Sequence, residues 1–200
     1  MKAIIYTKYG PPEVLQLKEV KKSTPKEDEV LVEVHAASVN YGDVSFARGK
    51  PFLVRLMGAR LLKPIYTILG SDIAGRVETV GNKEKQFRPG NEVFGDVSGS
   101  GWSGYAEYVS IPKSVLALKP NNITFEQAAA SSQAGVVALQ GLRDRGKIQP
   151  GQKVLINGAS GGVGTFAVQI SKSFGAEVTG VCSSRNLGMV RSIGADRVID

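Results

Sequence analysis

The chain has 200 residues, 42% of them hydrophobic and 22% charged, which is ordinary for a globular protein of one large or two small domains. Its net charge of +7 allows a polyanionic partner, but no basic helix has base-reading spacing, and we expect no nucleic-acid binding. The single cysteine, Cys182, and the single histidine, His35, exclude an internal disulfide and a Cys/His zinc site. We therefore expect no bound metal and structural roles for both side chains.

Short alternating runs between turn residues fill the first 119 residues and predict a β-rich domain of the partly open barrel type. A short helix is predicted from Asn40 to Arg48, where Gly49 ends it. The glycine-rich segment 97–104, which holds the only tryptophan, Trp102, is predicted to be a loop over or beside a site. Strands are predicted over 2–6, 14–20, 30–35, 73–80, 92–95, 105–110 and 116–119.

A long helix is predicted after the β-rich part of the chain. The capping box Thr124–Gln127 opens it, and an alanine-rich run continues it to Gly146, with Gly135 as an interruption. No apolar stretch reaches the roughly 20 residues of a membrane helix, and the run at residues 1–7 is too short for a signal peptide. A cytoplasmic location is therefore the expectation.

The stretch from Val154 to Cys182 reads as strand, tight turn, helix and strand. Strands are predicted over 154–156 and 178–182, a glycine-rich elbow over 158–164, and a helix that stops at Gly175. This order predicts the first βαβ unit of a dinucleotide-binding fold.

Each glycine of the elbow has its own predicted role. Gly161 lets the backbone approach a pyrophosphate, and Gly164 lets the helix pack closely on the strand. The N–H groups at the start of the helix would then bind the phosphates. The alternative is a glycine-rich turn in an ordinary α/β domain. The predicted diphosphate-binding residues are Ser160, Gly161, Gly162, Val163 and Gly164.

The residues after the second strand indicate which dinucleotide fits. An NAD site usually has an acid about 20 residues after the glycines, but Val181 and Cys182 stand there. Ser183, Ser184 and Arg185 follow, and two hydroxyls with a guanidinium suit a ribose 2′-phosphate. NADP(H) is therefore the predicted cofactor. The alternative for Arg185 is a solvated cap of the next helix.

Taken together, these segments resemble the medium-chain dehydrogenase/reductase superfamily, and its zinc-free quinone oxidoreductase branch fits best. The resemblance implies a GroES-like barrel over 1–122, then linking helices and the first βαβαβ half of a Rossmann domain over 123–200, with the active site in a cleft between them. The matching segments are AASVNYGDV (36–44), LGSDIAGRVETVG (69–81), RPGNEVFG (88–95), GYAEYV (104–109), NGASGGVG (157–164) and GADRVID (194–200).

The resemblance also implies an activity. Where the zinc enzymes of the superfamily have a Gly-His-Glu zinc motif, this chain has Gly70-Ser71-Asp72, and the neighbourhood of Asn40 stands in place of a zinc cysteine. Zinc-assisted alcohol oxidation is therefore not expected. The resemblance implies zinc-independent hydride transfer from NADP(H) to a small quinone or enone-like acceptor, in an enzyme that could form a homodimer.

The catalytic candidates are Asn40, Tyr41 and Ser45. Asn40 matches an asparagine that lines the cleft in the quinone reductases, and its amide is the predicted polarising donor; a plain helix N-cap is the alternative. Ser45 occupies a position where those enzymes often have tyrosine, and Tyr41 is the nearby substitute. Their lysine after the second strand corresponds to Leu187, with Arg185 as the substitute.

The resemblance does not explain the acid-free stretch between Asp43 and Asp72. Cations and apolar residues mix over 46–66, which could be a mobile lid, a weak contact with an anionic membrane surface, or an amphipathic helix packed on the β domain. The cations from Asp43 to Asp72 are Arg48, Lys50, Arg55, Arg60 and Lys63.

The chain ends at Asp200, in the predicted third parallel strand, whereas a full Rossmann sheet has three more strands. We therefore expect the front part of a longer enzyme, which by itself would bind the cofactor weakly and not turn over. A non-catalytic NADPH-binding module is the main alternative. An interaction module built on the barrel is another, although no sequence feature favours it.

Overall fold

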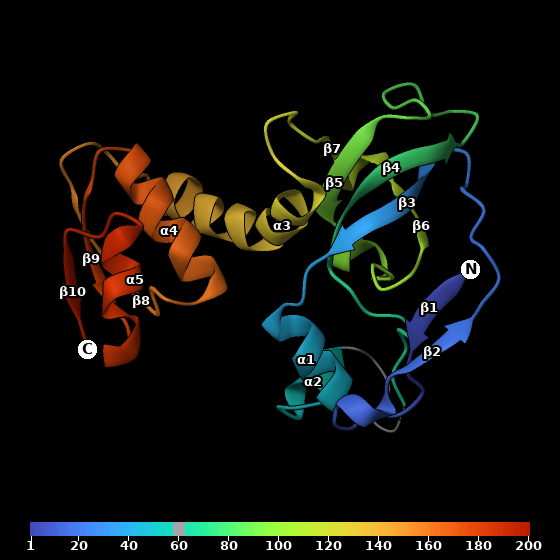
Figure 1. The fold of residues 1–200 in the computed structure, drawn as a ribbon, viewed down its shortest axis with the longest axis horizontal. Helices are drawn as coiled ribbons and strands as arrows, with labels where there is room; N and C mark the ends of the chain where they lie inside the picture. Colours follow the sequence, from blue (N-terminus) through green and yellow to red (C-terminus); the bar gives the residue numbers. More distant parts are fainter. Residues whose placement is uncertain (58–62) are drawn as a thin grey trace. The chain divides into compact units, whose positions relative to one another are not determined.

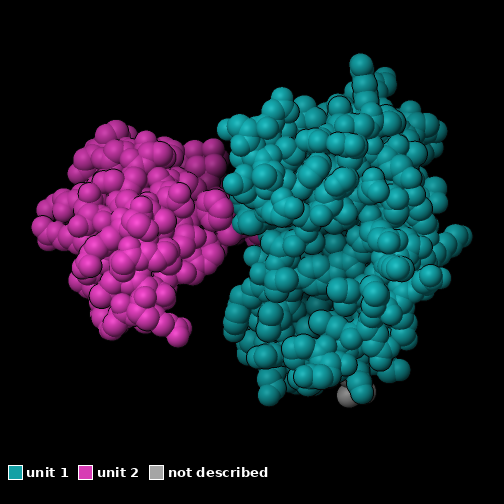
Figure 2. Space-filling view, viewed as in Figure 1, with its two compact units in different colours: residues 1–132 teal, residues 133–200 magenta. Residues whose placement is uncertain are grey.

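The computed structural model describes residues 1–57 and 63–200, which divide into two compact units, 1–132 and 133–200 (Figure 2). Each unit has its own apolar core. The division falls inside helix α3 (Phe125–Leu139). The strands are β1 (Lys2–Ile5), β2 (Gln16–Glu19), β3 (Glu29–Ala37), β4 (Asp72–Val80), β5 (Glu92–Asp96), β6 (Tyr108–Pro112), β7 (Ala117–Leu118), β8 (Lys153–Asn157), β9 (Glu177–Val181) and β10 (Arg197–Ile199). The other helices are α1 (Tyr41–Arg48), α2 (Leu53–Met57), α4 (Gly162–Ser173) and α5 (Leu187–Ser192).

The first unit contains an antiparallel five-stranded sheet of order β6-β3-β4-β5-β7 and a separate hairpin, β1-β2 (Figure 1). Val30 and Val32 of β3 lie in one core cluster with Ile73 of β4, as the alternating pattern predicts. His35 of β3 stacks on the ring of Phe125 at 4.5 Å, consistent with a structural role. The predicted β-rich fold class is confirmed for this part of the chain.

Two predicted strands begin two or more residues later than expected. The strand predicted from residue 14 begins at Gln16, because Pro12–Val14 forms a 3₁₀ turn. The strand predicted from Tyr105 begins at Tyr108, because Tyr105 bonds to Leu69 through its N–H and to Ile4 of β1 through its carbonyl and does not pair with β3. The segment 97–104 is irregular apart from a short 3₁₀ turn, but Trp102 is buried and packs on Phe46 with ring centroids 4.8 Å apart. Trp102 is therefore a core residue rather than the cover of a site.

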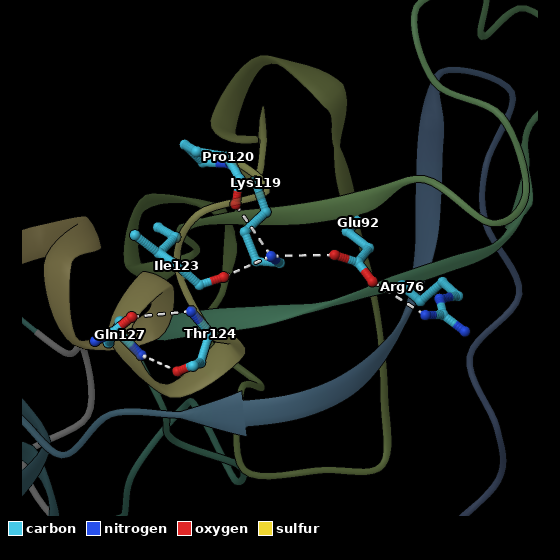
Figure 3. Close-up of polar contacts among 7 residues, drawn as sticks. All are labelled: Arg76, Glu92, Lys119, Pro120, Ile123, Thr124 and Gln127. Atoms are coloured by element: carbon cyan, nitrogen blue, oxygen red, sulfur yellow. Dashed lines mark hydrogen bonds and ion pairs between the residues drawn. The ribbon is translucent and has the colours of Figure 1, made fainter.

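The start of α3 is fixed by two sets of polar contacts (Figure 3). The Thr124 N–H donates to the Gln127 side chain at 3.0 Å, and the Gln127 N–H donates to Thr124 Oγ1 at 3.2 Å, which confirms the predicted capping box. The buried ammonium of Lys119 lies 3.1 Å from a carboxylate oxygen of Glu92. It also donates to the carbonyls of Pro120 at 3.1 Å and Ile123 at 2.7 Å.

Gly135 does not interrupt α3, in contrast to the prediction. A side chain there would make only ordinary contact with the ring of Phe166 on α4, 3.7 Å away. A single glycine costs a helix only roughly 1 kcal/mol, and α3 continues through it. The helix changes at Gln140, where a π-helical turn, Gln140–Arg145, replaces the predicted α-helix.

The second unit is a parallel sheet of order β10-β9-β8, with α4 contacting both β8 and β9 and α5 contacting β10. This is the strand order of the first half of a Rossmann fold, as predicted. Cys182 is buried in the core of this unit, which confirms its packing role. Leu155 of β8 is 66% exposed, and β8 is an outer strand of the sheet formed by the described residues.

The basic stretch 46–66 is described except for residues 58–62, so Arg60 lies outside the described residues. Its only helix beyond α1 within the described part is the five-residue α2. Phe52, Leu53 and Leu56 are all more than half exposed, which argues against an amphipathic helix packed on the barrel for residues 52–56. None of the helices in the described residues has the length and apolarity needed to cross a bilayer.

Candidate functional site

The glycine elbow lies between β8 and α4. Gly158 has φ +74°, a conformation that favours glycine, and the Gly161 N–H donates back to its carbonyl at 2.9 Å. Gly161 is the N-cap of α4, and the first helical bond is the Thr165 N–H to the Gly161 carbonyl at 2.9 Å. The three N–H groups before Thr165 have no partner within the helix by its geometry, and Gly162 and Val163 are exposed. The elbow therefore offers peptide donors and a positive helix end to an anion.

Gly161 and Gly164 differ in how much room the structure leaves for a side chain. A side chain on Gly164 would place Cβ 2.1 Å from the Gly158 carbonyl oxygen and 2.8 Å from Ala159 Cα, so only glycine allows this close approach. A side chain on Gly161 would meet only the Gly158 oxygen, at an ordinary 3.4 Å. The protein itself therefore does not require glycine at Gly161, whereas a closely bound ligand would.

The predicted 2′-phosphate residues, Ser183, Ser184 and Arg185, are all exposed and follow directly on β9, beside the elbow. Asn186, which the sequence analysis did not select, connects the two segments. Its amide nitrogen donates to Ser160 Oγ at 3.1 Å and to Ser183 Oγ at 3.3 Å.

A carboxylate from β10 also reaches this site. The Ser184 hydroxyl donates to the carboxylate of Asp200, because β9 and β10 are neighbours in the sheet. An acid was expected only directly after β9, whereas Asp200 follows the next strand, β10. An acid here can accept hydrogen bonds from ribose hydroxyls and repels a phosphate.

Asn40 lies in a partly buried polar cluster of the first unit. Its side-chain nitrogen donates to Ser38 Oγ at 3.0 Å, Ser71 Oγ at 2.8 Å and Asp72 Oδ2 at 2.8 Å. Its backbone N–H donates to Asp43 Oδ2 at 2.7 Å, which makes Asn40 the N-cap of α1 in a capping box. The amide donors are thus engaged within the protein, and the role of Asn40 as a polarising donor stays a prediction.

Asp43 is the buried carboxylate at the centre of this cluster, only 3% exposed. It accepts hydrogen bonds from the Gly70 N–H at 3.1 Å and the Ser71 hydroxyl at 3.4 Å. Burial raises the pKa of the Asp43 carboxyl, and hydrogen bonds, that from the Asn40 N–H first among them, oppose the rise. Burial also raises the pKa of Tyr105, and the negative charge of Asp43 adds to the effect. The Tyr105 hydroxyl donates to the Ser38 carbonyl at 3.1 Å.

The structure does not bring the other two catalytic candidates into this cluster. Tyr41 is 82% exposed at the first position of α1, and Ser45 is buried on the same helix. Their catalytic roles stay predictions. Asp43, Ser38 and Tyr105 were not selected from the sequence, although Ser38 and Asp43 lie within or beside the segment 36–44 that carries the resemblance. Within residues 1–57 and 63–200, no three His, Cys, Asp or Glu side chains are grouped so that they could hold a metal ion.

Known proteins match both units. Residues 26–121 match the family described as the alcohol dehydrogenase GroES-like domain. The whole chain is 37% identical over 210 residues to a 2-methylene-furan-3-one reductase of Solanum lycopersicum, and it covers 52% of that protein. It is also 37% identical over 209 residues to a chloroplastic NADPH-dependent alkenal/one oxidoreductase of Arabidopsis thaliana, of which it again covers 52%. The solved quinone oxidoreductase of Coxiella burnetii superposes with a TM-score of 0.89 at 32% identity, over 100% of this chain and 62% of that one.

The chain is similar over its whole length to members of the medium-chain dehydrogenase/reductase superfamily, and in particular to its quinone oxidoreductase branch. It spans about half the length of the curated superfamily relatives that it matches. The resemblance predicted from the sequence segments is thereby confirmed. The superfamily assignment also accounts for the order of the two units, a GroES-like barrel first and a Rossmann-type parallel sheet second.

Proposed function

We propose that the protein is part of a zinc-independent, NADP(H)-dependent oxidoreductase that transfers hydride to a small quinone or enone-like acceptor. The observation that carries this proposal is the elbow at the start of α4, where Gly164 is required for packing and Gly161 leaves room for a ligand. Relatives named as alkenal/one, furanone and quinone oxidoreductases support the acceptor class.

The residues of the second unit fit the cofactor. The exposed N–H groups of Gly162 and Val163 would hold the diphosphate, and Ser183 with Arg185 would hold the 2′-phosphate. Asn186 would keep these two segments in register through Ser160 and Ser183. When bound, the nicotinamide of NADPH supplies the hydride.

In the first unit, the proposed role of Asn40 is to orient the acceptor oxygen that becomes negative. In the described structure Asp72, Ser38 and Ser71 fix the orientation of its amide, which supports a preorganised group rather than a mobile one. To donate a hydrogen bond to the substrate oxygen, the Asn40 amide would have to share that hydrogen with one of these three residues or give up its bond to that residue. Tyr41 and Ser45 remain candidates from the resemblance alone. The domain limits 1–122 and 123–200 also remain a proposal beside the compact units 1–132 and 133–200.

Cofactor selection is tested by titrating the protein with NADPH and NADH while observing nicotinamide fluorescence. Arg185→Gln should weaken NADPH binding roughly 10- to 100-fold, the value of a charge-assisted hydrogen bond, and leave NADH within about twofold. The control Arg191→Gln removes an exposed arginine from α5. Asp200→Asn should strengthen NADPH binding, because it removes a negative charge beside Ser184. Equal losses for both cofactors in Arg185→Gln would contradict the proposed 2′-phosphate site.

A non-catalytic NADPH-binding module is the second candidate. The engaged amide of Asn40 and the burial of Ser45 favour it, because neither offers a free group to an acceptor. A quinone and enone panel applied to the full-length protein separates the two: consumption of NADPH with any acceptor supports the enzyme, whereas cofactor binding without consumption supports the module.

The predicted membrane contact, homodimer and cellular location each need their own experiment. Contact of the stretch 46–66 with an anionic membrane surface would appear as salt-sensitive sedimentation with anionic liposomes, and no sedimentation at low salt would remove it. A homodimer of the full-length enzyme would appear in analytical ultracentrifugation. A cytoplasmic location stays a prediction, because relatives include proteins named chloroplastic and mitochondrial.

A further inference from the structure

The first unit contains a largely apolar cavity that borders the polar cluster around Asn40 and Asp43. Its volume is about 380 Å³, within the range of small-molecule sites. The residues that line it come from β1, the turn after it, α1 and the segments before β4 and β6. Most are apolar and include Ile4, Leu15, Val44, Ala47 and Leu69, and the buried Asp43 and the partly buried Tyr105 also line the cavity.

A second hollow of about 390 Å³ adjoins the cavity, and Gly10 and Arg48 line both. Its other lining residues include Tyr9, Lys50 and Arg55, so three cations surround it. The Arg55 Nε donates to the Gly49 carbonyl at 3.0 Å, and its guanidinium lies 4.9 Å from the ring centroid of Tyr9. The Gly10 N–H donates to the Ala47 carbonyl at 3.0 Å, which ties the turn to the end of α1.

The charge of this hollow is not balanced by the protein. Within residues 1–57 and 63–200, no ion pair joins Arg48, Lys50 or Arg55 to a carboxylate. The sequence has no acid between Asp43 and Asp72, and Asp43 is buried among its own hydrogen-bond donors. Three neighbouring cations without a counter-charge attract an anion, and the guanidinium groups suit a carboxylate or phosphate.

We propose that these two hollows form one binding site for a single-chain anionic amphiphile. The alkyl chain would occupy the apolar cavity, and the carboxylate or phosphate would lie among Arg48, Lys50 and Arg55. Binding at this site needs neither the cofactor nor the reaction, although the site borders Asp43 and Tyr105. It gives Arg48, Lys50 and Arg55 of the acid-free stretch a ligand.

The test is isothermal titration of the protein with hexanoate, octanoate and decanoate, each below its micellar concentration. Affinity should rise about fourfold for each added CH₂ until the cavity is full. Arg48→Gln combined with Lys50→Gln should weaken decanoate binding at least tenfold. The matched control, Lys85→Gln combined with Arg88→Gln, removes the same two charge types from exposed positions and should bind like the original protein. Circular dichroism verifies that each variant is folded.

Two further ligands test whether binding depends on the anionic head group of the amphiphile or on its apolar chain alone. Decyl phosphate should bind like decanoate, and uncharged decanol should bind at least tenfold more weakly. Equal binding of decanol, equal losses in both double variants, or no saturable binding of any amphiphile would each overturn the proposal. Binding to anionic phosphatidylserine vesicles without binding of monomeric decanoate would also overturn it, in favour of a membrane-surface contact.

Discussion

The elbow of the second unit and the polar cluster of the first differ in what builds them. The elbow consists of backbone within seven residues, Gly158 to Gly164, and its shape depends on glycines that tolerate φ > 0 or close approach. The polar cluster joins polar groups of residues 38–43 to groups of Gly70, Ser71, Asp72 and Tyr105, through contacts that span 27 to 67 positions of the chain. A turn built from consecutive residues can be recognised as a sequence motif, whereas a cluster of side chains from distant segments cannot.

The two regions should also respond differently to substitution. In the elbow, one added methyl group at Gly164 decides whether the turn can form. In the cluster, the Asn40 amide has three partners, so the loss of one contact leaves two others. The following predictions test this difference, from the largest expected effect to the smallest.

Gly164→Val should destabilise the second unit by about 3 kcal/mol, because its Cβ would lie 2.1 Å from the Gly158 carbonyl oxygen. Urea unfolding measures this effect, and NADPH titration should show lost binding. Gly161→Ala is the matched control: stability should stay within about 0.5 kcal/mol while NADPH binding weakens. Equal stability of the two variants would contradict the packing role of Gly164.

Lys119→Met should cost about 2 kcal/mol of unfolding free energy, because it leaves the Pro120 and Ile123 carbonyls without their donor and removes a partner of Glu92 (Figure 3). The control Lys83→Met breaks an exposed pair with Glu27 and should change stability by less than about 0.5 kcal/mol. If both variants lost the same unfolding free energy, the buried contacts of Lys119 would stabilise the protein no more than an exposed ion pair does.

Asn186→Ala should weaken NADPH binding about fivefold, the value of roughly 1 kcal/mol for a neutral hydrogen bond, without a measurable loss of stability. The reason is that Asn186 holds Ser160 and Ser183 in register. Fluorescence titration measures the affinity. Asn186→Asp keeps an acceptor but loses the donors, and recovery of binding in that variant would contradict the positioning role.

Asp43 should give a small pH dependence of stability with a defined sign. Its pKa in the folded protein is raised above the ordinary 3.8 by burial, so the unfolded chain releases this proton first as pH rises. Relative to Asp43→Asn, the original protein should therefore lose unfolding free energy as pH increases from near 3.8 through the raised pKa. Chemical unfolding at a series of pH values measures the difference, with the exposed Asp28→Asn as control. A difference that does not vary with pH would show that the pKa of Asp43 is not raised.

The sequence alone determined the helix caps and the glycine turn of this protein. The capping box at Thr124, the end of α1 at Gly49 and the elbow from Gly158 to Gly164 each depend on the conformational preferences of a few consecutive residues. Hydrophobic alternation gave the order of strands along the chain, although Tyr105 and Gly135 were misassigned because their surroundings come from distant segments.

Only the tertiary structure decided the polar environments. The pairing of β10 with β9 brings Asp200 to Ser184, and the packing of α1 beside the start of β4 surrounds Asn40 with Ser71 and Asp72. It also joins the turn at Gly10 to the end of α1, which places Arg48, Lys50 and Arg55 around one hollow. Such arrangements follow from long-range contacts, which set the burial and charge of each side chain and leave no fixed spacing in the sequence.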